Sequence, residues 1–253
     1  MAHEVQTADP TRGTWLNRVR VVLVETSHPG NIGASARAMK AMGFRRLALI
    51  SPREFPSAAA TARASGADDV LMNASHHAHL GEAIADCGIV IGTTARTRHL
   101  EWPVMAPREL ASWVVAQPPE TEIALVFGRE QSGLSNEELA LCHRVVRIPT
   151  DPDFTSLNLG QAVQILTYEL ALATPIAPLS DAEAEPLATA LELDNALTHA
   201  LSVMERIDFY HPARPKLLPL RVQRLLNRGG LKRSEVRILR GFLTAIEKSL
   251  PAE

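Results

Sequence analysis

The sequence predicts an α/β fold with a mainly parallel sheet, followed by a small all-helical domain. Short aliphatic and β-branched runs alternate with helical patterns between residues 19 and 172; these runs are Val19–Val24, Leu47–Ile50, Ile89–Ile91, Ile123–Phe127 and Val145–Ile148. Such alternation is typical of βαβ units, in which ligands bind beyond the carboxyl ends of the strands. We therefore expect functional residues in the loops that follow strands.

A helical pattern ends the α/β part of the sequence, and further helical patterns occupy the rest of the chain. One apolar stripe is formed by Leu159, Val163, Leu166 and Leu170. Pro175 and Pro178 cannot continue this helix, so the segment 174–180 predicts a linker. Two later stripes predict further helices, one at Leu187, Leu191, Leu197, Leu201 and Met204, the other at Val236, Leu239, Leu243, Ile246 and Leu250. The expected organisation is an N-terminal extension (1–18), an α/β domain (19–172), a linker (173–180) and a helical domain (181–253).

The composition, 46% hydrophobic and 21% charged residues in a chain of 253, is that of a globular protein. The first fifteen residues contain no apolar run of signal-peptide type, and no stretch approaches the roughly 18 apolar residues of a membrane span, so we expect a cytoplasmic protein. Cys87 and Cys142 lie in apolar surroundings and predict buried thiols. His76, His77 and His79 lack acidic or cysteine partners at motif spacing, which favours a solvated turn over a metal site.

Charge is unevenly distributed along the chain. The formal net charge is -2, yet the segment Arg206–Arg240 contains ten basic and two acidic residues, a net charge of +8. A basic face can be ordinary solvated surface, but this excess favours contact with phosphates. Two rows of arginines are the expected RNA contacts, and they would hold a nucleic acid without reading its sequence: Arg221, Arg224 and Arg228, then Arg233, Arg237 and Arg240.

The first strand is followed by the loop and helix start His28–Arg37. Gly30 and Gly33 have G-x-x-G spacing, which is not the G-x-G-x-x-G fingerprint of a dinucleotide site. At about 100° per residue, Arg37 lies off the apolar stripe of the following helix, which is formed by Ile32, Ala36 and Met39. Arg37 can therefore meet a ligand, although taken alone it fits a solvated surface arginine better.

Two further loops follow strands, 127–134 and 148–160. Gly128 and Gly133 have P-loop spacing, but Leu134 stands where that motif requires lysine, which disfavours nucleoside triphosphate binding. Ser135 and Glu138 have the spacing of a capping box, so Ser135 is expected to be structural. Taken alone, the second loop favours simple capping of the next helix, by Thr155, Ser156 or Asn158. The sequence has no G-x-S-x-G elbow of a serine hydrolase.

Together these loops resemble a known family. The motifs are VETSHPGNIGASARAMKAMG (24–43), ALVFGREQSGLSNEEL (124–139) and IPTDPDFTSLNLGQAVQILTYEL (148–170), with IGTTAR at 91–96. In order and wording they are similar to the SPOUT-superfamily, TrmH-like RNA 2′-O-methyltransferases, in particular to the TrmJ family of tRNA methyltransferases. The similarity covers residues 19–172.

This resemblance implies a C-terminal trefoil knot, a rare exception to unthreaded chains. It also implies a homodimer in which Arg37 lies close to the partner's cofactor pocket. The cofactor would be S-adenosyl-L-methionine, held by residues from three loops, namely Thr93, Thr94, Ala95, Gly128, Ile148, Thr155, Ser156 and Leu157. No metal or membrane partner is implied.

The implied reaction is attack of a ribose 2′-oxygen on the methyl group, with Arg37 and Ser156 as the catalytic residues. Guanidinium has a pKa above about 12 and accepts protons poorly, so we expect Arg37 to position the nucleotide and stabilise the developing alkoxide. Ser156 would hold the ribose or the cofactor, while Asn31 and Glu130 organise the loops. The implied target is a pyrimidine at position 32 of a tRNA anticodon loop. Two alternatives stay open: another RNA target, such as rRNA, or a non-catalytic RNA-binding protein.

Overall fold

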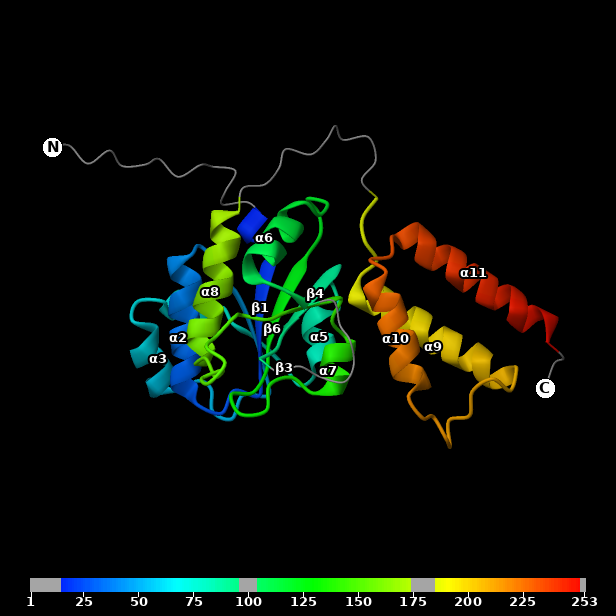
Figure 1. Cartoon of the computed structure of the whole chain (residues 1–253), viewed down its shortest axis with the longest axis horizontal. Helices are drawn as coiled ribbons and strands as arrows, with labels where there is room; N and C mark the ends of the chain where they lie inside the picture. Colours follow the sequence, from blue (N-terminus) through cyan, green and yellow to red (C-terminus); the bar gives the residue numbers. More distant parts are fainter. Residues whose placement is uncertain (1–14, 96–103, 174–184, 251–253) are drawn as a thin grey trace.

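The computed structural model describes residues 15–95, 104–173 and 185–250. Within these residues a seven-stranded sheet forms the centre of an α/β domain (Figure 1), and every strand pairs in parallel in the order β3-β2-β1-β6-β4-β7-β5. The strands are β1 (Val19–Val24), β2 (Arg46–Ile50), β3 (Ser75–His77), β4 (Ile89–Thr93), β5 (Val104–Met105), β6 (Ile123–Phe127) and β7 (Arg144–Val146). The predicted mainly parallel sheet is confirmed.

Helices cover both faces of the sheet (Figure 1). One face packs against α2 (Pro29–Ala41), α3 (Ala58–Ala64), α4 (Asp68–Met72), α6 (Pro107–Val115) and α8 (Leu159–Leu172). The other packs against α5 (Leu80–Ile84) and α7 (Asn136–Ala140). Alternate residues of β1 point to opposite faces, so Val21 and Leu23 join the first core while Val22 and Val24 join the second. The predicted stripe of α8 is buried at all four positions, Leu159, Val163, Leu166 and Leu170.

Two glycines let the helices around α2 approach closely. A Cβ added at Gly33 would lie 2.0 Å from the carbonyl oxygen of Ala60, so α2 and α3 are in backbone contact there. A Cβ at Gly160 would lie 2.8 Å from the Cβ of Ala34, which brings the first turn of α8 against α2. Gly33, the second glycine of the G-x-x-G spacing after β1, therefore serves the packing of α2 on α3, and Gly160 places the start of α8 beside α2.

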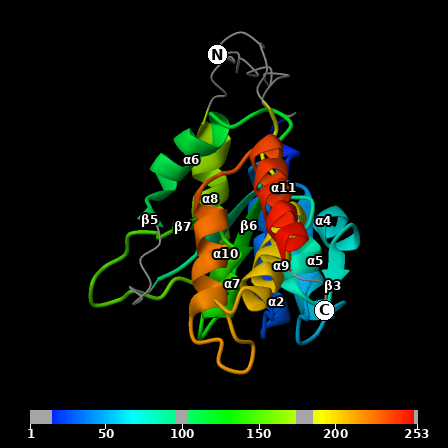
Figure 2. The ribbon, with the colours of Figure 1, turned by 90° about the vertical axis from the view of Figure 1, so that its right-hand side faces the viewer.

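The C-terminal part contains three helices and, among its described residues, no strand, which confirms the predicted helical domain. These are α9 (Ala190–Arg206), α10 (Leu218–Arg228) and α11 (Arg233–Ser249). Figure 2 looks onto α10 and α11, which both pack on α9. The buried side chain of Asn227 donates from Nδ2 to the carbonyl of Ala140, 2.6 Å away at the end of α7. The amide of Ala190 donates to the carbonyl of Cys87 at 2.9 Å. These bonds attach the helices directly to the α/β domain.

Two predicted segments differ from the structure, and others lie outside the described residues. His76 and His77 belong to edge strand β3, which pairs with β2, so the prediction of a turn is wrong there, although His76 is exposed as expected. The strand predicted at Val145–Ile148 begins one residue earlier and ends at Val146. The linker segment 174–180 lies outside the described residues, as do most of the extension 1–18 and Arg96. The knot stays a prediction. No helix in the described ranges is long and apolar enough to cross a membrane.

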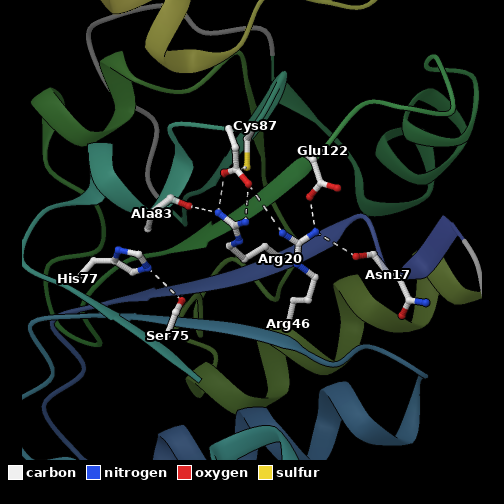
Figure 3. Close-up of polar contacts among 9 residues, drawn as sticks. Asn17, Arg20, Arg46, Ser75, His77, Ala83, Cys87 and Glu122 are labelled. Carbon is white, nitrogen blue, oxygen red and sulfur yellow. Dashed lines mark hydrogen bonds and ion pairs between the residues drawn. The ribbon is translucent and has the colours of Figure 1, made fainter. Parts of the chain in front are cut away.

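An ion-pair network closes the amino-terminal end of the sheet on the α5 face (Figure 3). Arg20 binds Asp86 through two hydrogen bonds of 2.8 Å and donates to the carbonyl of Ala83. Arg46 donates to Glu122 and to the carbonyl of Asn17. These arginines are engaged by intramolecular acceptors, so the network is structural.

Both thiols are buried, as predicted, and burial raises the pKa of Cys87 to about 12 and also raises that of Cys142. A thiol that stays protonated at neutral pH is a poor nucleophile and a poor metal ligand. Among the described residues there is also no group of three His, Cys, Asp or Glu side chains that could hold a metal ion.

One buried histidine gives a stability prediction. The Nδ1 atom of His143 accepts a 2.9 Å hydrogen bond from the Val90 amide, and burial together with Arg144 lowers the pKa of His143 to about 4. Between the ordinary value of 6.5 and about 4, the unfolded chain binds a proton that the native protein does not. Neutral His143 therefore makes its full contribution to the free energy of unfolding above pH 6.5. Below that pH the free energy of unfolding falls by up to about 1.4 kcal/mol per pH unit towards pH 4.

We expect His143→Gln to reduce this loss, because Gln can accept the Val90 hydrogen bond without binding a proton. The measurement is urea unfolding at pH 7.5 and pH 4.5 for the wild type, His143→Gln and the exposed control His79→Gln. The control should keep the wild-type pH dependence. Identical pH dependence in the wild type and His143→Gln would contradict the assignment.

Candidate functional site

A cavity of about 230 Å³ lies at the carboxyl ends of β4, β6 and β7. This is the edge of the sheet at which parallel α/β folds bind ligands. All eight residues predicted to hold the cofactor line it, although they come from separate parts of the chain: Thr93, Thr94, Ala95, Gly128, Ile148, Thr155, Ser156 and Leu157. The structure thus brings the predicted residues together in one cavity.

The loop after β6 forms one wall of the cavity through a tight return of the backbone. Arg129 and Gly133 form an antiparallel bridge, with the Gly133 amide donating to the Arg129 carbonyl at 2.9 Å. A Cβ at Gly128 would lie 2.2 Å from the backbone carbon of Gly133, and Gly133 has a φ of +70°. Both positions require glycine, because one has no room for a side chain and the other has a left-handed backbone. The spacing of Gly128 and Gly133 is therefore explained by this tight turn of the backbone.

The opposite wall is the segment that leads into α8, and here the structure decides between the capping candidates. Asn158 is the N-cap: its Oδ1 accepts from the Gly160 amide at 2.9 Å, and its own amide donates to Gln161 at 3.2 Å. Thr155 and Ser156 are exposed residues that line the cavity. The cap does not use them, so their hydroxyl groups can meet a ligand.

Glu130 connects the loop after β6 to the loop after β1, and Asn31 extends this connection to the segment before α8. Its carboxylate accepts hydrogen bonds from the amide and hydroxyl of Ser27 at 3.0 and 2.9 Å, from the His28 amide at 3.2 Å and from Asn31 Nδ2 at 3.0 Å. Asn31 Oδ1 in turn accepts from Asn158 Nδ2 at 2.9 Å. Asn31 and Glu130 therefore organise the loops.

These hydrogen bonds also set the charge of Glu130. Partial burial raises its pKa, but the donors on Asn31 and Ser27 outweigh that effect and lower the pKa to about 2. The group is thus a carboxylate at neutral pH. Because Glu130 also lines the cavity, it gives the wall a negative charge.

Arg129, which lines the same wall, is held by two carboxylates. It donates to Glu25 at 2.8 Å from Nε and to Glu138 at 3.0 and 3.1 Å from its terminal nitrogens. These partners raise the pKa of Arg129 further above its ordinary value. Glu138 also completes the predicted capping box with Ser135, which confirms the structural role of that serine. Arg129 therefore fixes the loop to α7.

Arg37 lies apart from this cavity. It is exposed on α2, off the buried stripe of Ile32, Ala36 and Met39, as the periodicity predicts. It is not among the residues that line the cavity, and no hydrogen bond or ion pair joins it to the described part of the chain. One chain alone does not bring Arg37 to the predicted cofactor residues.

The six arginines predicted to contact RNA lie on α10 and α11. Arg221, Arg228, Arg237 and Arg240 are exposed, whereas Arg224 and Arg233 are half-buried. Arg233 already pairs with Glu192, at 3.2 Å from Nε. The exposed four are therefore better placed to contact phosphates than Arg233.

Several residues that line the cavity were not among those predicted to hold the cofactor. Examples are Phe127, Val146, Thr150, Leu159 and Ala162. All but Val146 lie within the motifs at 124–139 and 148–170, so a signal existed, but the apolar members have the same composition as ordinary core.

The chain matches two family models. The SpoU rRNA Methylase family matches residues 18–168, and the C-terminal domain of the tRNA methyltransferase TrmJ matches residues 191–253. The chain is 46% identical over 244 residues to the tRNA (cytidine/uridine/adenosine-2′-O-)-methyltransferase TrmJ of Pseudomonas aeruginosa, covering 92% of this chain and 95% of that protein. It is 43% identical to the tRNA (cytidine/uridine-2′-O-)-methyltransferase TrmJ of Sodalis glossinidius, with 94% of each covered.

Solved structures agree with these matches. The crystal structure of TrmJ from Z. mobilis has a TM-score of 0.81 at 33% identity and covers 90% of this chain and 98% of that one. A probable methylase family protein from Haemophilus influenzae has a TM-score of 0.61 at 40% identity, covering 92% and 97%. The chain therefore belongs to the SpoU methylase family and, within it, to the TrmJ methyltransferases.

Proposed function

We propose that this protein transfers a methyl group from S-adenosyl-L-methionine to a ribose 2′-hydroxyl of tRNA. This proposal rests on one observation: the fold brings eight residues from separate loops into one cavity. The relatives from Pseudomonas aeruginosa and Sodalis glossinidius are named as tRNA 2′-O-methyltransferases, which supports tRNA as the substrate. The family resemblance extends the proposal to a cytidine or uridine at position 32 of the anticodon loop, and to action in the cytoplasm.

The residues around the cavity fit this cofactor. Apolar side chains such as Phe127, Val146 and Leu159 suit an adenine ring, and the backbone groups at the strand ends can hydrogen-bond its edge. The carboxylate of Glu130 favours a ligand that carries positive charge. When bound, the cofactor supplies an electrophilic methyl group on a sulfonium.

The protein's own contribution is to position the nucleotide and stabilise developing charge. Ser156 lines the cavity and would hold the ribose or the cofactor through its hydroxyl group. Arg37 would bind the phosphate of the target nucleotide with its planar fork and lower the energy of the developing alkoxide. The proton leaves to that phosphate or to water, because guanidinium is a poor proton acceptor near neutral pH.

A homodimer would bring Arg37 to a cavity, and α8 has a face suited to it. Tyr168 and Leu172 are 48% and 51% exposed, and Ile165 continues the same face. This stripe is separate from the buried stripe of α8, and α8 as a whole packs on α2, which carries Arg37. A second copy covering it would shield apolar side chains and place Arg37 near the partner's cavity.

The remaining parts have separate proposed roles. Residues 19–172 form the methyltransferase domain with its trefoil knot, and residues 181–253 form the domain that holds tRNA through its exposed arginines. A different RNA substrate, such as rRNA, and a protein that only binds RNA are the alternatives.

The function is tested by incubating the purified protein with labelled S-adenosyl-L-methionine and either a tRNA pool or rRNA. We expect a 2′-O-methylated pyrimidine nucleoside in the tRNA digest, identified by mass spectrometry. Methylation of rRNA and not of tRNA would change the assigned substrate to rRNA. No transfer to any RNA would contradict the enzymatic proposal.

Arg37→Ala should lower turnover by at least about a hundredfold, because the nucleotide loses its positioning group, while cofactor affinity stays within about twofold of the wild type. Isothermal titration calorimetry and single-turnover methylation measure these two quantities. Arg108→Ala, at an 82% exposed side chain on α6, is the matched control. Parallel loss of cofactor binding would contradict a role confined to the nucleotide.

Mixed dimers test whether Arg37 acts on the partner's cavity. A protein that carries Arg37→Ala is mixed with a second protein that carries Ser156→Trp, in which the larger side chain blocks the cavity. If each variant is inactive alone, a random mixture should recover about a quarter of the wild-type rate, because one of the two sites in a mixed dimer is intact. A mixture that stays inactive would place Arg37 in the site of its own chain.

Glu130→Gln should weaken cofactor binding and lower the free energy of unfolding at pH 7 by about 1–3 kcal/mol, because hydrogen bonds to a charged acceptor are lost. The depressed pKa means that the wild-type advantage is present above about pH 4.5 and disappears as the pH falls through about 2. Urea unfolding at pH 7 and pH 3 should therefore show a smaller difference at the lower pH. Glu120→Gln, at an exposed site, is the control.

A further inference from the structure

Three large apolar side chains are exposed in the loop between α9 and α10 and are together termed the loop patch. Phe209 is 64% exposed, and Ile207 and Leu217 are 45% and 49% exposed. Exposed aromatic side chains are uncommon on a solvated loop, and three large apolar residues within one loop are not explained by packing. These side chains are therefore available to a binding partner.

The backbone holds Phe209 in this position. At the end of α9 the Asp208 amide donates to the Glu205 carbonyl at 3.0 Å, and the Phe209 amide donates to the Met204 carbonyl at 2.9 Å. With Asp208 in the left-handed region at a φ of 61°, this is a Schellman motif. A hydrophobic residue at the place of Phe209 usually packs back onto the helix, but most of this side chain stays exposed. The Schellman motif alone therefore does not explain why Phe209 is exposed.

The surroundings of the patch are strongly basic. The segment Arg206–Arg228 contains six basic side chains and one acidic side chain, Asp208, a net charge of +5. Arg214 and Lys216 lie within the loop itself, and both are exposed. Exposed aromatics among basic groups are the combination with which proteins bind unpaired nucleotides, since the cations contact phosphates while a base stacks on the ring.

The loop also lies at the functional end of the molecule. Figures 1 and 2 show it at the end where the strands have their carboxyl termini, which is the end that carries the cavity. From this loop α10 runs back to α7, where Asn227 binds the Ala140 carbonyl. RNA that contacts the patch would therefore approach the cavity from the same side.

We propose that Phe209 is a stacking platform for an unpaired nucleotide of the RNA substrate, with Arg214 and Lys216 contacting the neighbouring phosphates. This inference rests on the proposed function, because it takes RNA as the substrate. Direct stacking recognises single-stranded loops and rejects fully paired helices, whose bases are already stacked. The platform thus favours substrates that present a loop.

The test compares two RNAs with the same number of phosphates, a hairpin with an unpaired loop and a fully paired duplex. Phe209→Ala should weaken binding to the hairpin about tenfold and leave duplex binding unchanged, whereas Phe209→Trp should keep hairpin binding. Met72→Ala is the control, because Met72 is 79% exposed on α4, outside the helical domain that is proposed to bind RNA. Arg221→Ala should weaken binding to both RNAs alike. Fluorescence anisotropy at one fixed salt concentration gives the affinities.

The outcomes separate this proposal from the proposed function. Wild-type hairpin affinity in Phe209→Ala, or equal loss for hairpin and duplex, would overturn the platform. A change in sedimentation of RNA-free Phe209→Ala, without a change in hairpin affinity, would assign the patch to self-association instead. If the wild type binds the hairpin through Phe209 but methylates no RNA, the platform stands and the enzymatic proposal fails.

Discussion

The site depends on the carboxylate of Glu130 and the donors around it. Its hydrogen bonds join the loop after β6 to the loop after β1, whose strands are neighbours in the sheet. The bond between Asn31 and Asn158 extends this connection to the start of α8. Three segments far apart in the sequence are thereby held in one arrangement. Without the carboxylate, two backbone amides at Ser27 and His28 would lose their acceptor, which is costly away from water.

The sequence predicted the buried strands well because a strand covered on both faces needs a continuous apolar run. The bounds of β1 and β6 agree with prediction to the residue. In contrast, β3 and β5 have three and two residues and lie at the edges of the sheet. Their extended conformation comes from pairing with β2 and β7 rather than from their own composition, so no local pattern could reveal them.

The site was predictable only in part. Thr155, Ser156 and Asn158 can all cap a helix, and their order in the sequence does not rank them. Asn158 is the cap in the structure, where its side chain also binds Asn31, 127 residues away. No sequence pattern indicated that Arg129 fixes the loop after β6, for a similar reason. One of its carboxylate partners is 104 residues away in the sequence. The cavity residues were found through the family resemblance, since periodicity alone favoured capping.

The helical domain is attached to the catalytic end by directed contacts. Arg129 in the cavity wall binds Glu138 of α7, and the last residue of α7, Ala140, accepts from Asn227 of α10. The Asn227 side chain is 6% exposed, so this hydrogen bond is shielded from competing water. An apolar residue there could fill the same space but could not fix the orientation of α10. The proposed RNA-binding face is therefore held relative to the cavity by hydrogen bonds between side chain and backbone.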